Sequence, residues 1–573
     1  MFNRPTPPGS GWKHAYLPVL IACLTLFAPS SRAQQNPHAA QPHPQKAVRQ
    51  DILVYIKGTW NTLSRSMNEC SSVVDPKVAP GHATILYVPH HGTVPAAVAA
   101  LQERCNVEVE RLPRTIRHLG DVMPGDLKGS GLLYLPNRYV VPGGRFNEMY
   151  GWDSYFIIRG LLEDGDRKLA RGIVENFFYE IENYGAVLNA NRTYYLTRSQ
   201  PPFLTSMILA VYDADKKAGK TDTKWLARAY KYAVRDHALW THAPNFAGDT
   251  QLSRYFDVGQ GPVPEIADHP EYYAMVADWL VRHPEVKTNY IAPTIADGIG
   301  PELRVPLCGE PPCKDSRPVK FTADFYKGDR AMRESGFDTS FRWGPYDGST
   351  HHYAPICLNS LLYKEEADLG QMATMLGKTK QAKRWRAQAE QRKQRVNQLL
   401  WNAAKGMFFD WDFLTSQLSS YDYLTTYYPL WVGMATPEQV KALMSNLKRF
   451  EHPGGLAMSD NDSGVQWDLP FGWAPTILIA VEGMRRAGYN ADADRVSEEF
   501  LSMVLENYER DGTIREKYNV VDRSTEANVV GYRQNVIGFG WTNATFLLLL
   551  HALPQAEQNK ILQAAKTAAA GAW

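Results

Sequence analysis

Apolar residues recur at spacings of three and four positions from Asp51 onward, which predicts a succession of amphipathic helices. Runs in which apolar and polar residues alternate strictly are scarce, so few strands are expected. The predicted helices cover residues 51–66, 153–163, 167–182, 203–217, 223–238, 270–282, 354–376, 379–401, 421–433, 437–447, 474–487, 491–508, 541–552 and 556–569.

These helices come largely in pairs of unequal polarity. Residues 474–487 and 541–552 are apolar nearly all round, which is typical of buried helices. Residues 379–401 instead combine one apolar stripe with a polar face, as a covering helix does. The alternation predicts an all-α fold, an (α/α) toroid with an inner and an outer ring. A regular solenoid is disfavoured because no sequence repeat of fixed period is present.

Five long loops separate the predicted helices, and they are rich in aromatic residues and glycine. They cover residues 142–152, 184–202, 283–345, 454–473 and 510–540. Loops at one end of a toroid line a single cavity, and long loops in a compact fold are usually functional. The Pro- and Cys-rich residues 299–320 indicate an insertion, so we predict one domain over residues 48–573.

The start of the chain has the pattern of an export signal. Basic residues precede an apolar run at residues 16–28, and small residues follow it, which predicts a signal peptide over residues 1–33. A lipoprotein cleavage box ending at Cys23 is the alternative. Residues 34–47 are polar and Pro-rich, which predicts a disordered leader. We therefore expect a periplasmic or secreted protein, outside the membrane once the signal is cleaved.

The composition of 44% hydrophobic and 21% charged residues is that of a globular protein. Removal of residues 1–33 takes away three basic residues and no acidic one, which leaves a net charge of about −1. This balance excludes the basic surface that nucleic acids or acidic membranes need, and it favours a neutral substrate. No partner protein is indicated, and we expect a monomer.

Export would permit disulfides among the cysteines of the mature chain. We predict bridges between Cys70 and Cys105 and between Cys308 and Cys313, with Cys357 as a buried thiol. Sequence cannot fix the connectivity, and a zinc site is the alternative for the second pair.

Residues 142–155 read PGGRFNEMYGWDSY and lead into a predicted buried helix. The two glycines allow the backbone a close approach to another group, and Arg145 offers a planar fork of donors suited to vicinal hydroxyls or a carboxylate. Alternatively, Arg145 pairs with Glu148 and Trp152 belongs to the core.

Residues 466–475 read QWDLPFGWAP and place a second Trp-Asp pair before another buried helix. Asp468 could cap that helix, since aspartate is a preferred residue at helix starts.

Together these two segments resemble the trehalase family. The first is similar to its signature PGGRFxExYxWDxY at every fixed position, and the second to QWDxPxGW. The resemblance extends from about residue 51 to 552. It also includes NANRTYYLTRSQPP at 189–202, ESGFDTSFRW at 334–343, EKY at 516–518 and GFGWTN at 538–543.

The resemblance implies an (α/α)6 barrel that hydrolyses α,α-trehalose to two glucose molecules with inversion, without a metal or cofactor. It implies that Asp338 is the general acid and Glu516 the general base. Pairing of Glu516 with Lys517 on the surface is the alternative. The positions that match sugar contacts are Arg145, Trp152, Asp153, Asn189, Arg198, Ser199, Gln200 and Gly336, with Glu302 and Trp467 as further candidates.

Inversion needs a protonated carboxyl at the glycosidic oxygen and a carboxylate on the opposite face that holds a water. The two carboxyl groups must lie roughly 6.5–9.5 Å apart to make room for that water. The acid also needs a raised pKa, which desolvation by Phe337 and Trp343 would supply. A nearby cation would lower that pKa, so we expect Arg342 to point away from Asp338 or to bind substrate.

Three departures from the family concern the leaving-group sugar, and one of them is the insertion around Cys308 and Cys313, which lies beside the second of the other two in the chain. Residues 519–537 hold one glycine and lack the glutamate expected before Tyr532, where the family forms a lid, unless Glu526 replaces it. The nearest match to the family's Arg-Pro-Glu triplet is Gly300 to Glu302, with Arg304 as a substitute arginine. The alternatives are therefore another inverting α-glucosidase with a different disaccharide substrate, or a slow trehalase with an open pocket.

Two further readings are disfavoured. A sugar-binding protein without catalysis would have no need of both carboxylates. The adjacent pairs His90-His91 and His351-His352 could suggest a metal, but adjacent histidines rarely face one ion, so no metal is expected.

Overall fold

The computed structural model describes residues 50–75, 77–78, 82–268, 271–306, 316–527 and 535–570. All of them belong to one compact unit, Arg49–Trp573. The predicted signal peptide (1–33), the predicted leader (34–47) and the predicted Cys308–Cys313 bridge lie outside the described residues.

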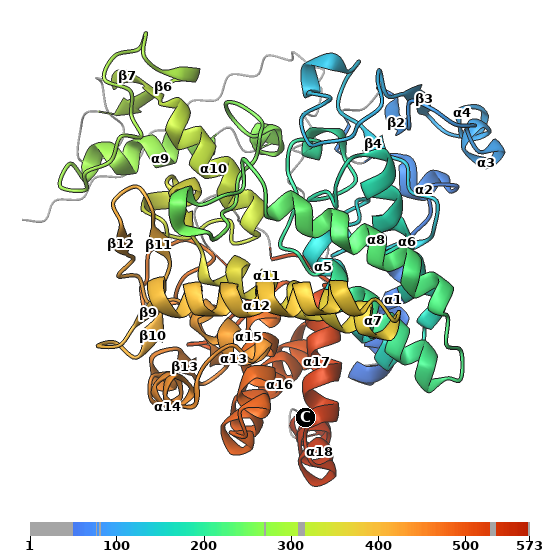
Figure 1. Cartoon of the computed structure of the whole chain (residues 1–573), viewed down its shortest axis with the longest axis vertical. Helices are drawn as coiled ribbons and strands as arrows, with labels where there is room; N and C mark the ends of the chain where they lie inside the picture. Colours follow the sequence, from blue (N-terminus) through green and yellow to red (C-terminus); the bar gives the residue numbers. More distant parts are fainter. Residues whose placement is uncertain are drawn as a thin grey trace, which may run out of the picture. The chain divides into compact units, whose positions relative to one another are not determined.

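An inner ring of six helices forms the centre of the described chain (Figure 1). Each helix contacts the next in sequence, and the last contacts the first, which closes the ring. The inner helices are α5 (Gly151–Glu163), α7 (Leu204–Lys217), α11 (Ile356–Met375), α13 (Tyr428–Val432), α15 (Ala474–Arg486) and α17 (Gly540–Ala552).

An outer set of helices covers this ring. It comprises α6 (Arg167–Asn183), α8 (Thr223–Trp240), α12 (Thr379–Leu399), α14 (Pro437–Ser445), α16 (Asn490–Asp511) and α18 (Gln555–Ala570). Figure 1 shows α12 lying across α11, and its buried residues mark the covering face: Ala382, Trp385, Ala389, Arg392 and Val396. Inner helices followed by covering ones confirm the predicted all-α toroid, and the closed ring of six confirms the (α/α)6 barrel.

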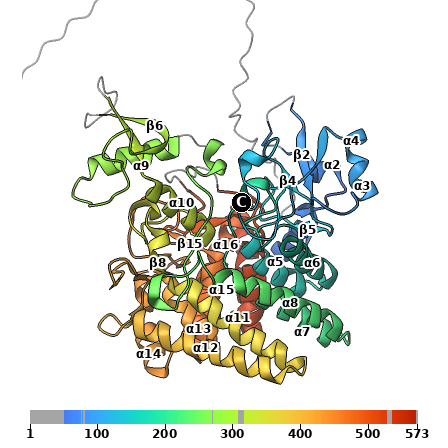
Figure 2. The same cartoon turned by 45° about the horizontal axis from the view of Figure 1, so that its top comes forward.

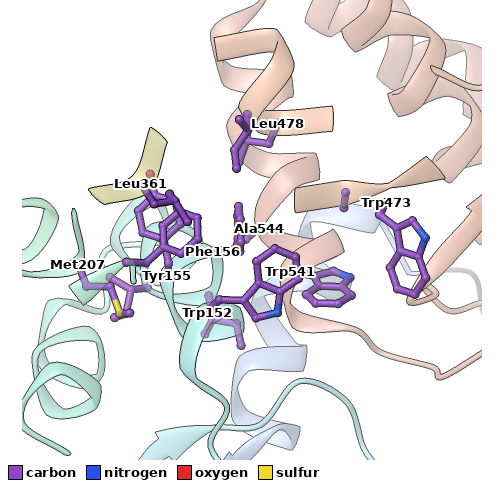
Figure 3. Close-up of a cluster of buried hydrophobic side chains, with 14 of the residues drawn as sticks. Trp152, Tyr155, Phe156, Met207, Leu361, Trp473, Leu478, Trp541 and Ala544 are labelled. Atoms are coloured by element: carbon purple, nitrogen blue, oxygen red, sulfur yellow. The ribbon is translucent and has the colours of Figure 1, made fainter. Parts of the chain in front are cut away.

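Large side chains fill the space where the inner helices meet (Figure 3). Trp152, Tyr155 and Phe156 come from α5, and Trp541 comes from α17, with the two indole rings 5.8 Å apart. All four are buried, and burial of each such side chain contributes about 1.5–3 kcal/mol. A Cβ on Gly160 would lie 2.8 Å from Ala544, so this glycine permits the close contact of α5 with α17.

Short strands, which the sequence did not predict individually, pair among the loops. The parallel sheet β3 (Val107–Arg111), β2 (Thr84–Val88) and β4 (Leu132–Leu133) lies with α3 (Ala96–Ala99) and α4 (Leu101–Arg104) (Figures 1 and 2). Antiparallel pairs are β6 (Ile299–Pro306) with β7 (Ser316–Phe321), and β15 (Phe471–Trp473) with β16 (Lys517–Asn519). Apart from β4, the two-residue strands are β1 (Ser64–Arg65), β5 (Tyr139–Val140), β8 (Tyr353–Ala354), β9 (Trp401–Asn402), β10 (Met407–Phe408), β11 (Trp411–Asp412), β12 (Gln417–Leu418), β13 (Glu451–His452) and β14 (Gly455–Leu456).

The cysteines that the structure describes follow the prediction. Cys70, the first residue of α2 (Cys70–Val73), is bonded to Cys105, with the Cα atoms 5.7 Å apart. Cys357 is a buried free thiol.

One helix corrects the prediction of a loop over residues 283–345. Helix α10 (Ala323–Ser335) lies within it, and the buried residues of α10 include Arg330 and Arg333. Arg330 pairs with Asp257 and Arg333 with Asp329, so the helix buries ion pairs beside its apolar residues. These buried charges obscure the apolar periodicity by which the helix could have been predicted. The other helices are α1 (Ile52–Thr62) and α9 (Glu271–Arg282).

The predicted helix 421–433 is also shorter than expected. A 3-10 turn, Leu424–Tyr427, precedes α13, whose second residue is Pro429. Proline lacks an N–H and is accepted in a helix only in the first turn, so the α-helix begins just before it.

Candidate active site

A cavity of about 520 Å³ opens among the loops of the barrel. Each of the five long loops predicted from sequence contributes side chains to its wall, for example Arg145, Asn189, Asp338, Trp467 and Glu516. The cavity is therefore built from segments that are far apart in the chain.

Most of the predicted site residues lie together in this wall. The predicted residues that line the cavity are Arg145, Trp152, Asp153, Asn189, Arg198, Gln200, Gly336, Asp338, Trp467 and Glu516. Lining residues that the sequence analysis did not select include Arg192, Tyr194, Tyr195, Glu265, Tyr272, Arg333 and Gln466.

Two predicted contacts are not in the wall. The Ser199 hydroxyl is fully buried and donates to the carbonyl of Val187 at 2.6 Å, so it holds a loop together. Glu302 lies at an exposed position of β6 and is absent from the cavity lining. A single serine and a Pro-Glu pair are too short as sequence motifs to distinguish a residue of the cavity wall from a structural or exposed one.

Asp338 follows α10 and reaches the cavity with 31% of its side chain exposed. Its backbone carbonyl accepts a hydrogen bond from the Gln466 amide, and the Trp467 N–H donates to Thr339 O at 3.0 Å. These bonds tie the segment after α10 to the second signature segment.

Arg333, which the sequence analysis did not consider, brings a cation close to Asp338. Arg342 makes two hydrogen bonds of 2.7 Å to Asp410, so it points away from Asp338 as predicted. The Nη1 atom of Arg333 instead lies 3.9 Å from Asp338 Oδ2.

Glu516 lies directly before β16, with 17% of its side chain exposed. Lys517 Nζ donates to Glu516 Oε2 at 2.9 Å and stands 5.1 Å from the ring centre of Trp473. The Lys517 side chain is fully buried behind Glu516, which lines the cavity, so this pair does not lie on an exposed surface.

Asp153 brings a third carboxyl group to the cavity. Burial raises its pKa well above the ordinary range, and the negative charges of Glu516 and Asp338 raise it further. The raised pKa favours the protonated carboxyl group, which can donate a hydrogen bond to a sugar hydroxyl.

Arg198 is 2% exposed and forms an ion pair with Glu265, with Asp257 3.6 Å away. Burial alone would raise the pKa of Glu265, but the Arg198 guanidinium holds that pKa below its usual value. The sequence feature that could have identified Glu265 is the dipeptide Pro264-Glu265, which is the same Pro-Glu pair as at residues 301–302. This pair lies at the cavity, whereas Glu302 does not.

The alternative pairing of Arg145 with Glu148 is not observed. Glu148 is bonded to Arg192 at 2.6 Å and to Lys77 at 2.7 Å, whereas the Arg145 guanidinium lies 4.7 Å from the ring centre of Phe146. Arg145 is exposed and lines the cavity, so its donors are accessible from the cavity.

Asp468 organises a loop and does not cap α15. Its carboxylate accepts from Ser459 at 2.9 Å, from Ser463 at 2.5 Å and from the Phe341 N–H at 3.0 Å. The helix itself starts at Ala474 without a side-chain cap.

Gly336→Ala should lower both stability and activity. Gly336 ends α10 at φ +78°, and an added Cβ would lie 3.0 Å from the Trp152 ring. The left-handed conformation costs alanine about 1–2 kcal/mol, and relief of the contact would displace Asp338. We expect a lower Tm and a kcat/KM reduced about tenfold, the scale of about 1.4 kcal/mol in the barrier.

Gly377→Ala is the matched control, because Gly377 has φ +69° and its added Cβ would meet nothing within 4 Å. This control should lose stability only. Equal kcat/KM values for the two variants would contradict the assigned role of Gly336.

Comparison with known proteins identifies the relatives of this chain. The model of the family described as Trehalase matches residues 27–298 and 318–554. The probable trehalase of Eremothecium gossypii is 33% identical over 551 residues, which cover 85% of this chain and 71% of that protein. The cytosolic neutral trehalase of Saccharomyces cerevisiae is 35% identical over 445 residues, and the aligned part covers 72% of this chain and 56% of the yeast protein. The chain therefore spans little more than half the length of that relative.

A solved structure supports the same relationship. Neutral trehalase Nth1 from Saccharomyces cerevisiae superposes with a TM-score of 0.73 at 31% identity, over 90% of this chain and 96% of that one.

The prediction of a periplasmic or secreted protein with a signal peptide is contradicted. Curated relatives from several fungi are named cytosolic neutral trehalases. The family match also begins at residue 27, inside the predicted signal peptide. A short apolar run that follows basic residues is weak evidence for a signal peptide, and the prediction based on it was wrong.

Among the described residues, no helix has the length and hydrophobicity needed to cross a membrane. The family model matches nearly all of the described chain, and the barrel resembles that of a solved trehalase. Both signature segments contribute residues to one cavity wall. The chain belongs to the trehalase family of glycoside hydrolases.

Proposed function

We propose that this protein hydrolyses α,α-trehalose to two glucose molecules, with inversion at the attacked anomeric carbon. The observation that carries the proposal is the convergence of Asp338 and Glu516 on one cavity of about 520 Å³. The trehalases named above as relatives support the choice of substrate.

In this mechanism Asp338 donates its proton to the glycosidic oxygen as the bond to the anomeric carbon breaks. Glu516 accepts a proton from a water that attacks the same carbon from the opposite face. The attacked ring leaves as β-glucose and the other ring as α-glucose. Lys517, bonded to Glu516 Oε2, fixes the orientation of that carboxylate.

The neighbouring groups suit a neutral, hydroxyl-rich ligand. The raised pKa of Asp153 favours a protonated carboxyl group that can donate a hydrogen bond, and Arg145 offers donors at an exposed position of the wall. Arg198 is held rigidly by Glu265 and Asp257, so it binds hydroxyls without further loss of side-chain freedom.

Aromatic rings supply flat apolar faces against which sugar rings stack. Trp152, Trp467, Trp473 and Trp541 line the cavity, and the rings of Trp467 and Trp473 lie parallel with centres 3.7 Å apart. Such a wall also limits the water that reaches the site, which strengthens its electrostatic interactions. We propose that residues 48–573 form the catalytic domain and that it acts as a monomer.

A second candidate is hydrolysis of a different α-linked glucose disaccharide. Since Pro264-Glu265 lies at the cavity, we infer that Val263-Pro264-Glu265 takes the place of the family's Arg-Pro-Glu triplet, which would remove a cation from the leaving-group side. Loss of one charged donor would relax the discrimination between disaccharides.

Initial rates of glucose release from trehalose, kojibiose, nigerose, maltose and sucrose separate the two candidates. We expect the highest kcat/KM for trehalose. A higher kcat/KM for any other disaccharide would replace trehalose as the substrate and leave the site assignment intact. Asp338→Asn protein, prepared in parallel, controls for contaminating glycosidases.

A further inference from the structure

Two adjacent histidines and one aspartate converge outside the cavity. His351 Nε2 lies 2.9 Å and His352 Nε2 lies 3.1 Å from the same atom, Asp324 Oδ1. One ligand atom from each residue falls within 4.8 Å of the others. From this juxtaposition we propose that Asp324, His351 and His352 form a binding site for a divalent transition-metal ion such as Zn²⁺.

The local backbone explains how two adjacent histidines can face one ion. From the sequence alone, no metal was expected at this pair. They lie in the 3-10 turn Thr350–His352, where successive side chains are rotated by about a third of a turn instead of pointing to opposite sides as in a strand. Their rings lie together, with centres 3.9 Å apart. Asp324 comes from the first turn of α10, which contacts this 3-10 turn.

The donor set and its spacing suit such an ion. Two imidazole nitrogens and a carboxylate oxygen are typical zinc ligands, and a water completes the tetrahedron. Bond lengths of 2.0–2.2 Å place tetrahedral ligand atoms about 3.3 Å apart, so the observed 2.9 and 3.1 Å need only a slight opening. Asp324 is 33% exposed, which leaves a solvent side for entry of the ion and for the water ligand.

Neighbouring groups hold the three ligands in place. Asn289 Nδ2 donates to Asp324 Oδ2 at 3.1 Å, which turns Oδ1 toward the histidines. Arg254 donates to His351 O at 2.9 Å, and the Phe413 N–H donates to His352 O at 3.1 Å. Outer partners of this kind orient ligands and typically change metal affinity 10–100-fold.

Two features limit the affinity. Among the described residues, His351 Nδ1 is buried without a hydrogen-bond partner, so that ring lacks an outer acceptor when its Nε2 binds the ion. The positive charge of Arg254 also disfavours additional positive charge at His351. We therefore expect reversible binding that is weaker than in closed structural zinc sites.

The test uses the full chain without a histidine tag, stripped of metal with a chelator. Equilibrium dialysis measures Zn²⁺ affinity, and Co²⁺ absorption reports the ligand geometry. We expect Asp324→Asn and His352→Gln each to weaken Zn²⁺ binding at least about tenfold, and Asn289→Ala by about tenfold. Asp324→Asn keeps the size of the side chain, and unchanged Tm values without metal will show that the variants are folded.

The other adjacent pair provides the matched control. His90 and His91 have ring centres 4.4 Å apart, but no carboxylate joins them in a described cluster, so His90→Gln with His91→Gln should leave the affinity unchanged. No Zn²⁺ binding, or equal affinity in wild type and Asp324→Asn, would show a hydrogen-bonded cluster only and overturn the proposal. Sulfur-to-cobalt absorption would place the ion on cysteine and overturn it as well. None of these outcomes depends on trehalose hydrolysis.

Discussion

Asp338→Asn and Glu516→Gln are each expected to lower kcat on trehalose by at least about 100-fold. A positioned general acid or base contributes roughly 10²–10⁴-fold, and an amide can neither donate the acid's proton nor accept one from water. Both side chains line the cavity, with 31% and 17% of their surfaces exposed, so the isosteric amides should be tolerated. KM should change only a few-fold, because binding contacts remain.

Asp462→Asn controls for the loss of a carboxylate near the site. Asp462 is exposed on loop 454–473 and is not part of the cavity wall, so its kcat should stay within about twofold of wild type. Initial-rate measurements and thermal melts of all three variants check the expectation. A kcat near wild type for a folded Asp338→Asn or Glu516→Gln protein would refute that assignment.

Arg192→Met should cost about 3–5 kcal/mol of unfolding free energy at pH 7, the usual effect of breaking a buried ion pair from one side. The Arg192 side chain is 4% exposed and bonds to Asp75 and Glu148, which are 1% and 0% exposed. Methionine fills similar volume but leaves Glu148 with Lys77 as its remaining described cation. Urea unfolding of the wild type and the variant measures the difference.

The same network predicts how the difference depends on pH. Burial opposes ionisation of Glu148, but Arg192 and Lys77 together lower its pKa to about 2. A carboxyl group with a lowered pKa stabilises the fold fully above its unfolded value of about 4.3, and this contribution is lost as pH falls from there toward 2. The deficit of Arg192→Met should therefore shrink between pH 7 and pH 3.

Arg235→Met is the control for this experiment. Arg235 pairs with Glu182 at an exposed position, with side chains 46% and 58% exposed, and such pairs contribute at most about 1 kcal/mol. A loss below about 1 kcal/mol for Arg192→Met, or a deficit independent of pH, would contradict the role given to the buried network.

The helices of the barrel could be predicted because the positions of their apolar side chains indicate which faces are buried. The all-round apolar segments 474–487 and 541–552 became α15 and α17 with ends shifted by a residue at most. Helix α10 could not be predicted in this way, because Arg330 and Arg333 are buried against acidic partners. In the sequence, a buried charged residue cannot be distinguished from a solvent-exposed one, because the acidic partner that permits its burial is brought close only by the fold.

The cavity wall followed from long signatures, whereas individual roles within it required the fold. Sequence predicted that Arg342 points away from Asp338, but it did not single out Arg333, whose approach to Asp338 depends on the fold. Sequence analysis proposed Glu302 and did not consider Glu265, although both follow a proline. Only the fold shows that Arg198 pairs with Glu265.

Inverting hydrolysis of trehalose is tested most directly by following fresh enzyme and trehalose by proton NMR before the anomers equilibrate. With Asp338 as acid and Glu516 as base, each turnover should release one α-glucose and one β-glucose. Two α-glucose molecules per turnover would contradict inversion and the assigned base, and no glucose release from trehalose would contradict the proposed activity.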